Sequence, residues 1–442
     1  MQFKEMQFNT QTNTLLLCKF SSKDHNSILN TACNLITDII QTNYNAISEE
    51  NFEQNLTETV KRILILQLHH LYDRDIEPDI DQIIREAWEL VNATFIPKRS
   101  YRSTFIIDKP DIDCMSKRMK VLRNMPQPEQ RTQQWYERRH NLITASNAYL
   151  AFGSESNKNR LIYEKCQPIN TDKFSRVNTE SPMHKGQKYE PVSVMLYEEK
   201  YKTKVEDFGC ITHETYSFLG ASPDGINCDK SSPRYGRMLE IKNISNREIN
   251  GIPKKEYWIQ MQLQMETCKL PECDFLETRF IEYESYGEFT NDGTFTHTED
   301  GKNKGIIICF TRDEKPIYEY APIGISSEEY DKWEATIMKE HTNDSWIHNI
   351  YWKLDEMSCV LVTRNTEWFN AVIHQMQDLW NTVLNERVSG YEHRAPKKRI
   401  KQEHATANTA ITANNTVTVI PGELVGISKC LIPSNNLIDP ES

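Results

Sequence analysis

Two short motifs in the middle of the chain place carboxylates and a lysine near one another. Asp224 lies in Ser222-Pro223-Asp224-Gly225, and Glu240 and Lys242 follow in Leu239-Glu240-Ile241-Lys242. Because proline fixes φ and glycine permits a reversal, the first motif predicts a turn directly after a strand. Side chains alternate along a strand, so Glu240 and Lys242 would share one face while the apolar residues of their motif face the core. Oxygen ligands gathered in this way are typical of a site for Mg²⁺, with Mn²⁺ as the alternative.

A third carboxylate, Glu190, follows the segment His184 to Tyr189 at the predicted start of a helix that packs beside the sheet. Hydrolysis of a phosphodiester needs an attacking hydroxide near neutral pH and stabilisation of the developing charge, which one or two metal ions can supply. Lys242 would orient or help deprotonate the water, or neutralise the transition state. Taken alone, a Ser-Pro-Asp-Gly motif is usually a surface turn. Taken alone, a Glu-x-Lys pair usually lies on the solvated face of a strand. Their occurrence together predicts a metal-dependent nuclease, with Glu190, Asp224 and Glu240 as metal ligands.

The elements that must position these residues are predicted to form a mixed sheet flanked by helices. Apolar runs rich in β-forming residues predict strands, and periodic apolar residues between them predict helices. The predicted strands are 205–211, 218–221, 238–241, 275–281 and 306–310, and the predicted helices are 183–201, 256–268, 328–341 and 367–386. This order predicts an α/β (α+β) fold.

The remaining segments predict further domains. Apolar residues recur at three- and four-residue steps near 28–40, 60–71 and 80–91, which indicates a helical N-terminal domain. Several prolines between Pro97 and Pro128 predict a basic linker or irregular excursion. The predicted domains are 1–125 (helical accessory domain and linker), 126–345 (nuclease), 346–393 (C-terminal helical extension) and 394–442 (a basic, then low-complexity disordered tail).

The net charge of −11 is unexpected for a DNA-binding protein, because phosphate contacts come from Lys and Arg. The charge is unevenly distributed, however. Between Glu49 and Glu89 there are eleven acidic and four basic residues, whereas basic residues gather at 117–123, 131–140 and 394–401. A metal-dependent nuclease also needs carboxylates at its centre, so the overall sign does not exclude DNA as the substrate.

Other sequence features exclude several classes of protein. No run of about 18 apolar residues and no signal-peptide pattern is present, so we expect neither a membrane anchor nor secretion. The eleven cysteines include no CxxC pair, which argues against a zinc site or a disulfide framework. We expect reduced, mostly buried thiols in an intracellular protein.

From about Gln130 to Glu284 the sequence resembles the lambda exonuclease and YqaJ-type viral recombinase family of the PD-(D/E)xK nuclease superfamily, which is similar to the alkaline nucleases of large DNA viruses such as baculoviruses. Five motifs in order support this resemblance: Trp135 to Arg139 with Ile143 to Ser146, Gly186 to Glu190, Asp224, Glu240 with Lys242, and Tyr257 to Gln262. It implies a restriction-endonuclease-like core. Asn243-Ile244-Ser245 departs from the family, since many relatives have a Cys-Pro pair there.

The resemblance also implies roles for further residues. Arg139 and Ser146 would contact a DNA phosphate at a 5′ end, and the backbone carbonyl of Ile241 would join the metal ligands. Gln260 would assist at the metal site as a further catalytic residue. Gln264 is the rival, because helical positions 260 and 264 share a face while Gln262 points elsewhere.

The function implied by the resemblance is that of an exonuclease which degrades one strand of double-stranded DNA from a 5′ end. Such an enzyme would act in viral DNA recombination, replication or genome maturation beside a single-strand DNA-binding or annealing protein. Some family members form rings around DNA, so a homo-oligomer is one option. An endonuclease or general alkaline nuclease would use the same site. A non-catalytic DNA-binding protein is the third hypothesis, against which the intact acids argue.

A short basic run begins the predicted tail. Lys397, Lys398, Arg399 and Lys401 follow Pro396 and resemble a nuclear import signal. This run predicts a host nuclear location, with the cytoplasm as the alternative. A solvated charge run after the last helix is the competing interpretation.

Overall fold

The computed structural model describes residues 20–396, except 73–74, 105–110, 129, 131, 170–178 and 180. The chain divides into two units, residues 1–396 and 397–442, and every described residue belongs to the first. Within the described part of the chain, none of the helices is long and apolar enough to cross a membrane.

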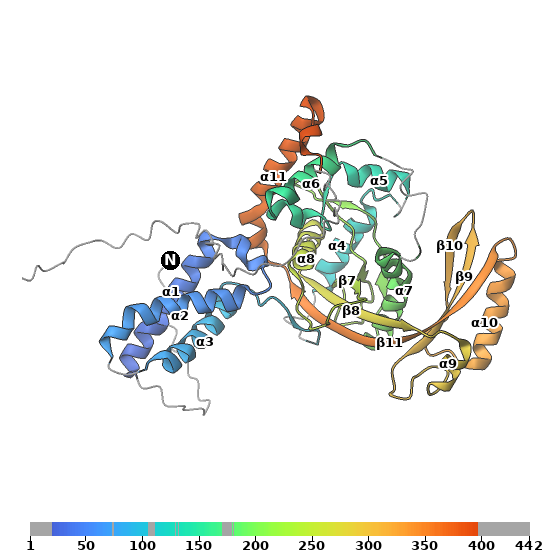
Figure 1. Cartoon of the computed structure of the whole chain (residues 1–442), viewed down its shortest axis with the longest axis horizontal. Helices are drawn as coiled ribbons and strands as arrows, with labels where there is room; N and C mark the ends of the chain where they lie inside the picture. The colour runs from blue at the N-terminus through green and yellow to red at the C-terminus, as the bar shows by residue number, and fades with distance from the viewer. Residues whose placement is uncertain are drawn as a thin grey trace, which may run out of the picture. The chain divides into compact units, whose positions relative to one another are not determined.

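Three helices near the N-terminus confirm the predicted helical segments (Figure 1). They are α1 (Ser22–Thr42), α2 (Phe52–Leu68) and α3 (Glu77–Thr94). In α1, the Ser21 side chain accepts a hydrogen bond from the Asp24 amide and so caps the helix start. Apolar residues of α1 at four-residue steps, such as Ala32 and Ile36, are fully buried against the neighbouring helices.

The predicted linker contains more regular structure than expected. A two-stranded pairing joins β1 (Tyr101–Arg102) to a later strand, and Ile112–Asn124 form helix α4. Pro126 and Pro128 follow this helix directly in the sequence. Asp111 caps α4 by accepting hydrogen bonds from the amides of Asp113 and Cys114, which explains why a helix begins there.

The central sheet is mixed, in agreement with the predicted fold class. Its strands lie in the order β10-β9-β11-β8-β7-β6-β3, and β1 pairs with β11. The bounds are β3 (Val205–Glu206), β6 (Gly225–Asn227), β7 (Met238–Asn243), β8 (Glu272–Glu282), β9 (Lys304–Arg312), β10 (Lys315–Tyr320) and β11 (Ser345–Thr363). β7 and β8 are parallel, and the other neighbours are antiparallel.

A smaller sheet contains β2 (Ile143–Thr144), β5 (Leu219–Ala221) and β4 (Ile211–Thr212). The single strand predicted over 205–211 is therefore wrong. That segment supplies β3 to the central sheet and leads to β4 in the smaller one. The other predicted strands, 218–221, 238–241, 275–281 and 306–310, all fall on observed strands.

Helices α7 (Pro182–Tyr201) and α8 (Lys255–Cys268) lie against β7 from opposite sides (Figure 1). Tyr197 of α7 packs with Leu239 and Ile241, whereas Met238 belongs to the large core cluster that includes Trp258 of α8. The alternation of side chains along β7 thus separates two cores. Three more helices, α5 (Gln133–His140), α6 (Glu155–Cys166) and α11 (Thr366–Ser389), lie around this centre.

Residues 345–363 form β11, so the helical extension predicted over 346–393 is wrong in its first part and right only for α11. β11 pairs with β9 through its first half and with β8 through its second half. Register shifts between Trp346 and His348 and between Leu354 and Glu356 interrupt its alternation. Bulges of this kind hide the two-residue period on which strand prediction depends.

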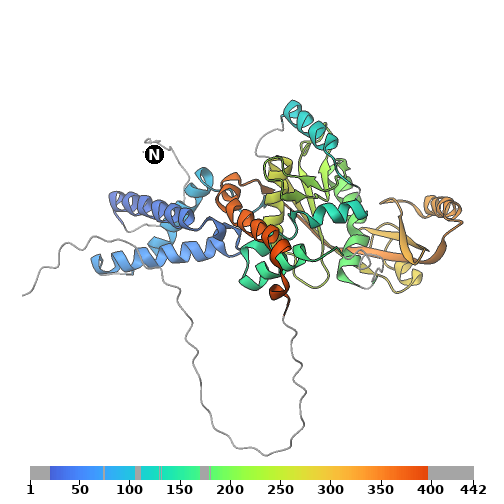
Figure 2. The ribbon, with the colours of Figure 1, turned by 90° about the horizontal axis from the view of Figure 1, so that it is seen from above.

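One end of the long strands β8 and β11 meets β9, β10, α9 (Tyr286–Asn291) and α10 (Ser327–Glu340) (Figures 1 and 2). We call residues 283–350 the arm. It contains small apolar clusters of its own, one built around Phe289 and Tyr330 and another around Phe310 and Ile337.

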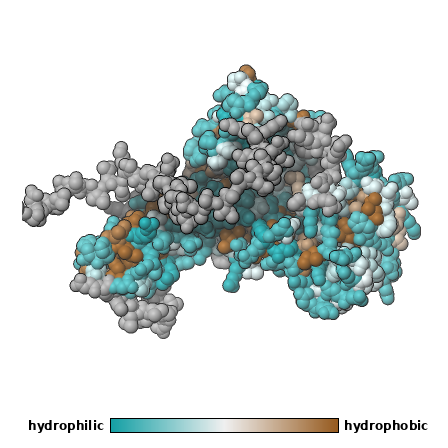
Figure 3. All heavy atoms as spheres, viewed as in Figure 1, coloured by the Kyte–Doolittle hydropathy of each residue, from teal (hydrophilic) through white to brown (hydrophobic). Residues whose placement is uncertain are grey.

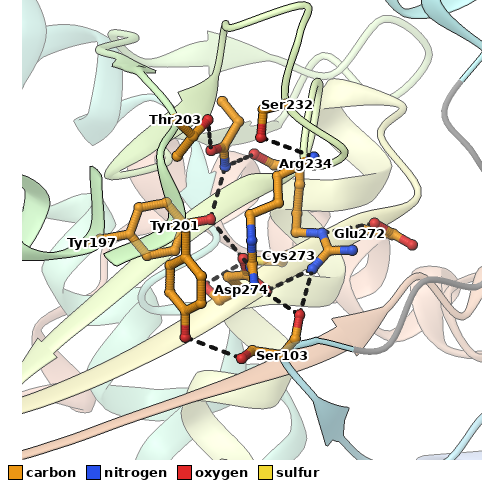
Figure 4. A network of polar contacts seen from close by, with 11 residues as sticks. Ser103, Tyr197, Tyr201, Thr203, Ser232, Arg234, Glu272, Cys273 and Asp274 are labelled. Carbon is orange, nitrogen blue, oxygen red and sulfur yellow. Dashed lines mark hydrogen bonds and ion pairs between the residues drawn. The ribbon is translucent and has the colours of Figure 1, made fainter. Parts of the chain in front are cut away.

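A buried polar network ties the segment before α4 to the central sheet (Figure 4). Asp274 of β8 is fully buried and accepts hydrogen bonds from Arg234, Arg237 and the Tyr197 hydroxyl. Both arginines also donate to the backbone carbonyl of Ser103. Buried charges are tolerated only when they are paired and hydrogen-bonded, and this network meets that condition.

Candidate active site

β7 places Glu240 and Lys242 on one face, as the alternation predicted, and the structure turns this face toward α8. Glu240 is fully buried, and the Lys242 ammonium forms an ion pair with it. Leu239 and Ile241 pack on the opposite side beneath α7. The acid and the lysine are therefore held on one side of a strand whose other side is anchored in the core.

Asp224 lies between β5 and β6, in the turn that the sequence predicted. Its Oδ2 accepts a hydrogen bond of 2.7 Å from the backbone N–H of Ile241. Gly225 directly follows and pairs with Leu239 of β7, which brings the turn beside the strand that contains Glu240. The two motifs, separated in sequence, thus meet at one place.

Helix α8 directs two glutamines to Glu240. The Nε2 of Gln260 donates to Glu240 Oε1 and the Nε2 of Gln264 donates to Glu240 Oε2, both at 2.7 Å. Gln262 faces away and bonds the backbone carbonyl of Thr363 at 2.9 Å. Positions four apart lie on one helix face, so Gln260 and its rival Gln264 both reach Glu240.

The negative charges of the carboxylates repel one another, and this repulsion changes their pKa values. Burial raises the pKa of Asp224 well above its usual value, and the charges of Glu240 and Glu190 raise it further, against the lowering effect of Lys242. Glu190, from α7, is therefore close enough to act on Asp224. Burial alone would lower the pKa of Lys242, but the charges of Glu240 and Asp224 outweigh it and raise that pKa.

The donor set is suitable for a hard divalent cation. The charges of Glu240 and Asp224 act on Lys242, the charge of Glu190 acts on Asp224, and a bound cation would neutralise the excess negative charge. Within the described residues, Gln264 Oε1 is buried without a hydrogen-bond partner beside this group. No three His, Cys, Asp or Glu side chains of the described part of the chain already form a metal-ligating group. The ligands named from the sequence, including the Ile241 carbonyl, remain a prediction.

Arg139 and Ser146 are brought together as expected. One Arg139 guanidinium nitrogen donates to Ser146 Oγ at 3.1 Å and another to Ser222 Oγ at 3.5 Å. The guanidinium also lies over the Trp135 ring, 4.3 Å from its centroid, and burial lowers its pKa. Ser222, two residues before Asp224, was not assigned a role from the sequence, although its position beside that acid was a signal for it.

A second unexpected residue lies behind Arg139. Lys165 of α6 is almost fully buried, and its ammonium donates to the Arg139 carbonyl at 2.8 Å. Burial lowers the pKa of Lys165 to about 8. A single lysine in an amphipathic helix gives no sequence signal for such a position.

The predicted basic clusters are largely engaged in structural contacts. Arg118 pairs with Glu214, Arg123 pairs with Glu206, and Arg138 donates to the carbonyl of Pro126. These contacts join α4 and α5 to neighbouring strands and loops. The proposed import signal at Lys397, Lys398, Arg399 and Lys401 lies outside the described residues.

A family model described as the YqaJ-like viral recombinase domain matches residues 134–270. An uncharacterized protein of Acanthamoeba polyphaga mimivirus, R354, is 30% identical over 329 residues, which cover 65% of this chain and 57% of that relative. The chain thus spans a little over half the length of the curated relative it matches.

Two solved structures of an alkaline exonuclease from Laribacter hongkongensis, one in complex with dAMP, are also similar. Each is 18% identical and aligns with 59% of this chain and 95% of its own, with TM-scores of 0.32 and 0.31. The segment 134–270 contains Glu190, Asp224, Glu240, Lys242 and both glutamines of α8. The predicted resemblance to the YqaJ-like viral recombinase family is therefore confirmed for the segment that builds this candidate site.

Proposed function

We propose that this chain is a divalent-metal-dependent deoxyribonuclease that hydrolyses one strand of double-stranded DNA from a 5′ end, in viral recombination, replication or genome maturation. The observation that supports it most is the set of contacts around Glu240, which joins Lys242, Gln260 and Gln264 on the face of β7 that also meets Asp224. The match of residues 134–270 to a viral recombinase domain supports the same class of activity.

Glu190, Asp224 and Glu240 would hold Mg²⁺ or Mn²⁺. When bound, the metal supplies an activated water and neutralises charge on the phosphate. The chain's own contribution is to fix the positions of these groups. Glu240 is held at both oxygens by the α8 glutamines, and Lys242, paired with Glu240, would orient the water and neutralise charge on the phosphate.

Arg139, Ser146 and Ser222 would bind the terminal 5′ phosphate. A guanidinium forms paired hydrogen bonds to phosphate oxygens, and the two serine hydroxyls already lie within reach of it. Ser222 belongs to the same turn as Asp224, so a phosphate bound here would fix the distance from the DNA end to the hydrolysed bond. This connection favours exonuclease over endonuclease activity.

The test uses the full chain, Mg²⁺ and three DNA substrates. Linear duplex with a 5′ phosphate, the same duplex with a 5′ hydroxyl and closed circular duplex are incubated with the wild type and the Asp224→Ala variant. We expect rapid loss of 5′-phosphorylated ends, slower loss of 5′-hydroxyl ends, intact circles and no hydrolysis by the variant. EDTA should stop the reaction of the wild type.

Each alternative gives a different result in this assay. Cleavage of the closed circles would indicate an endonuclease on the same site and would exclude a strict exonuclease. Absence of hydrolysis of all three substrates would exclude both nucleases and would leave the non-catalytic hypothesis. An Arg139→Gln variant that hydrolyses both kinds of end at wild-type rates would remove the 5′-phosphate part of the proposal.

A further inference from the structure

A cavity of about 810 Å³ lies between the start of α7, the end of β8 and strands of the arm. Lys185 and Lys188 of α7, Arg279 of β8, Tyr318 of β10 and His348 of β11 are among its lining residues. None of these residues belongs to the proposed catalytic group. The proposed catalytic mechanism therefore gives no role to the side chains of this cavity.

The cavity begins beside the candidate active site. Ser245, three residues after Lys242, contributes to its lining. The Asn243 side chain at the end of β7 donates a hydrogen bond of 2.7 Å to the carbonyl of Gly186 in α7. Glu277 of β8 is the register partner of Lys242, and Arg279, two positions further along β8, lies on the same face of that strand. A chain entering the cavity would therefore pass close to the carboxylates.

The cavity walls combine positive charge with exposed apolar groups. The lining contains Lys185, Lys188 and Arg279. Lys188 pairs with Glu282 of the lining at 2.7 Å, and Arg279 pairs with two carboxylates of β11 outside the lining, so Lys185 is the lining cation that forms no ion pair within the described residues. Apolar side chains in the same lining remain accessible: Ile347 is 47% exposed. Figure 3 shows apolar surface atoms gathered over the arm. A ligand for such walls carries both negative charge and apolar groups.

Single-stranded nucleic acid has this combination, since its phosphates contact cations while its unpaired bases pack on aromatic and apolar side chains. The cavity volume lies within the range of roughly 300–1,000 Å³ that encloses small ligands. In a duplex the bases are paired and stacked inside the helix, so they are not available to pack on the apolar walls of the cavity. A few unpaired nucleotides would fit.

We propose that this cavity binds a single strand of DNA next to the site of hydrolysis. The proposal rests on the proposed nuclease function, because it takes DNA to be the polymer that reaches the carboxylates. It assigns a role to the arm, which lies beyond the segment that matches the viral recombinase domain. A base would pack on His348 and the neighbouring Ile347, and Lys185 would contact a phosphate.

The test measures binding of a fluorescein-labelled oligo(dT) by fluorescence anisotropy in EDTA, over a series of KCl concentrations. The full-length wild type is compared with Lys185→Ala and Ile347→Glu, and with Lys332→Ala as a matched control on the exposed surface of α10. Loss of one phosphate contact should reduce the slope of log K against log salt by about 0.7. Placing a carboxylate where a base packs should weaken binding by roughly tenfold or more.

The expected result is that both cavity variants show these changes for oligo(dT), that neither changes binding to a blunt hairpin duplex, and that Lys332→Ala behaves as the wild type. Wild-type affinity and salt slope in both cavity variants would overturn the proposal, as would an equal effect on the blunt duplex. Because binding is read in EDTA, a protein that hydrolyses no DNA still gives this readout. Failure of the proposed function is thus seen separately, in the hydrolysis assay.

Discussion

Replacing Gln264 or Gln262 by methionine should separate the catalytic and structural roles of helix α8. Methionine has a similar length and lacks the amide. Gln264 bonds Glu240 at 2.7 Å and the Ser222 carbonyl at 3.2 Å, whereas Gln262 bonds Thr363 and Asn365 on the other side of the helix. Both glutamines are fully buried, so differences in exposure do not affect the comparison.

The expected loss of activity or stability follows from the hydrogen-bonding groups that each substitution leaves without a partner. Gln264→Met leaves Glu240 Oε2 without its amide donor while Gln260 and Lys242 still hold Oε1. Loss of such a partner of a metal ligand, the role proposed for Glu240, costs about 10–100-fold in activity or metal affinity. Gln262→Met leaves a buried carbonyl and a buried N–H without partners. At about 1–3 kcal/mol for each group, its unfolding free energy should fall by roughly 2–6 kcal/mol.

The assays are initial rates of duplex hydrolysis as a function of Mg²⁺ concentration and urea unfolding of the same preparations. We expect Gln264→Met to lower the rate or raise the Mg²⁺ requirement at a temperature where it is folded. Gln262→Met should unfold at lower urea while its rate stays within a few-fold of the wild type. Equal losses of rate in the two variants would refute the assignment of the two helix faces.

Three further predictions concern charge. Asp274→Asn should lower the unfolding free energy by about 3–5 kcal/mol in urea titrations, because it removes the negative partner of the buried Arg234; a change below 1 kcal/mol would contradict this. Asp224→Asn should abolish hydrolysis yet unfold at the same or a higher urea midpoint at pH 7 in EDTA, because the raised pKa of Asp224 means that its charge opposes folding. Lys269 lowers the pKa of Glu214 to about 2, so Glu214 stabilises the fold above its unfolded pKa of about 4.3 and loses that effect as pH falls toward 2. The urea midpoints of Glu214→Gln and the wild type should therefore differ modestly at pH 7 and converge between about pH 4.5 and pH 2. A difference that stays constant over this pH range would contradict a stabilising Glu214–Lys269 ion pair.

Several features of the fold were predictable because they depend on neighbours in the sequence. The apolar repeats of α1, α2 and α3 and the apolar runs of β7, β8 and β9 predicted those elements. β11 was not predictable in the same way. Its two register shifts interrupt the alternation, and its charged middle residues resemble a solvated segment. Helix α4 was hidden by the prolines around it, although Asp111 supplied a capping signal.

For the site, the sequence by itself determined which residues share a local face. Glu240 and Lys242 lie on one side of β7 because a strand has a period of two, and Gln260 and Gln264 lie together because a helix has a period of 3.6. The turn at Asp224 followed from its proline and glycine neighbours. These relations need no knowledge of distant packing.

Only the tertiary structure decided which of these local faces meet. The contact of Ser222 with Arg139 joins residues 83 positions apart. The effect of Glu190 on Asp224 depends on α7 packing over β7. The cavity beside the arm exists because β11 extends from β8 to β9. Such contacts result from the joint burial of several apolar faces, and a sequence pattern a few residues long contains no information about which faces are buried together.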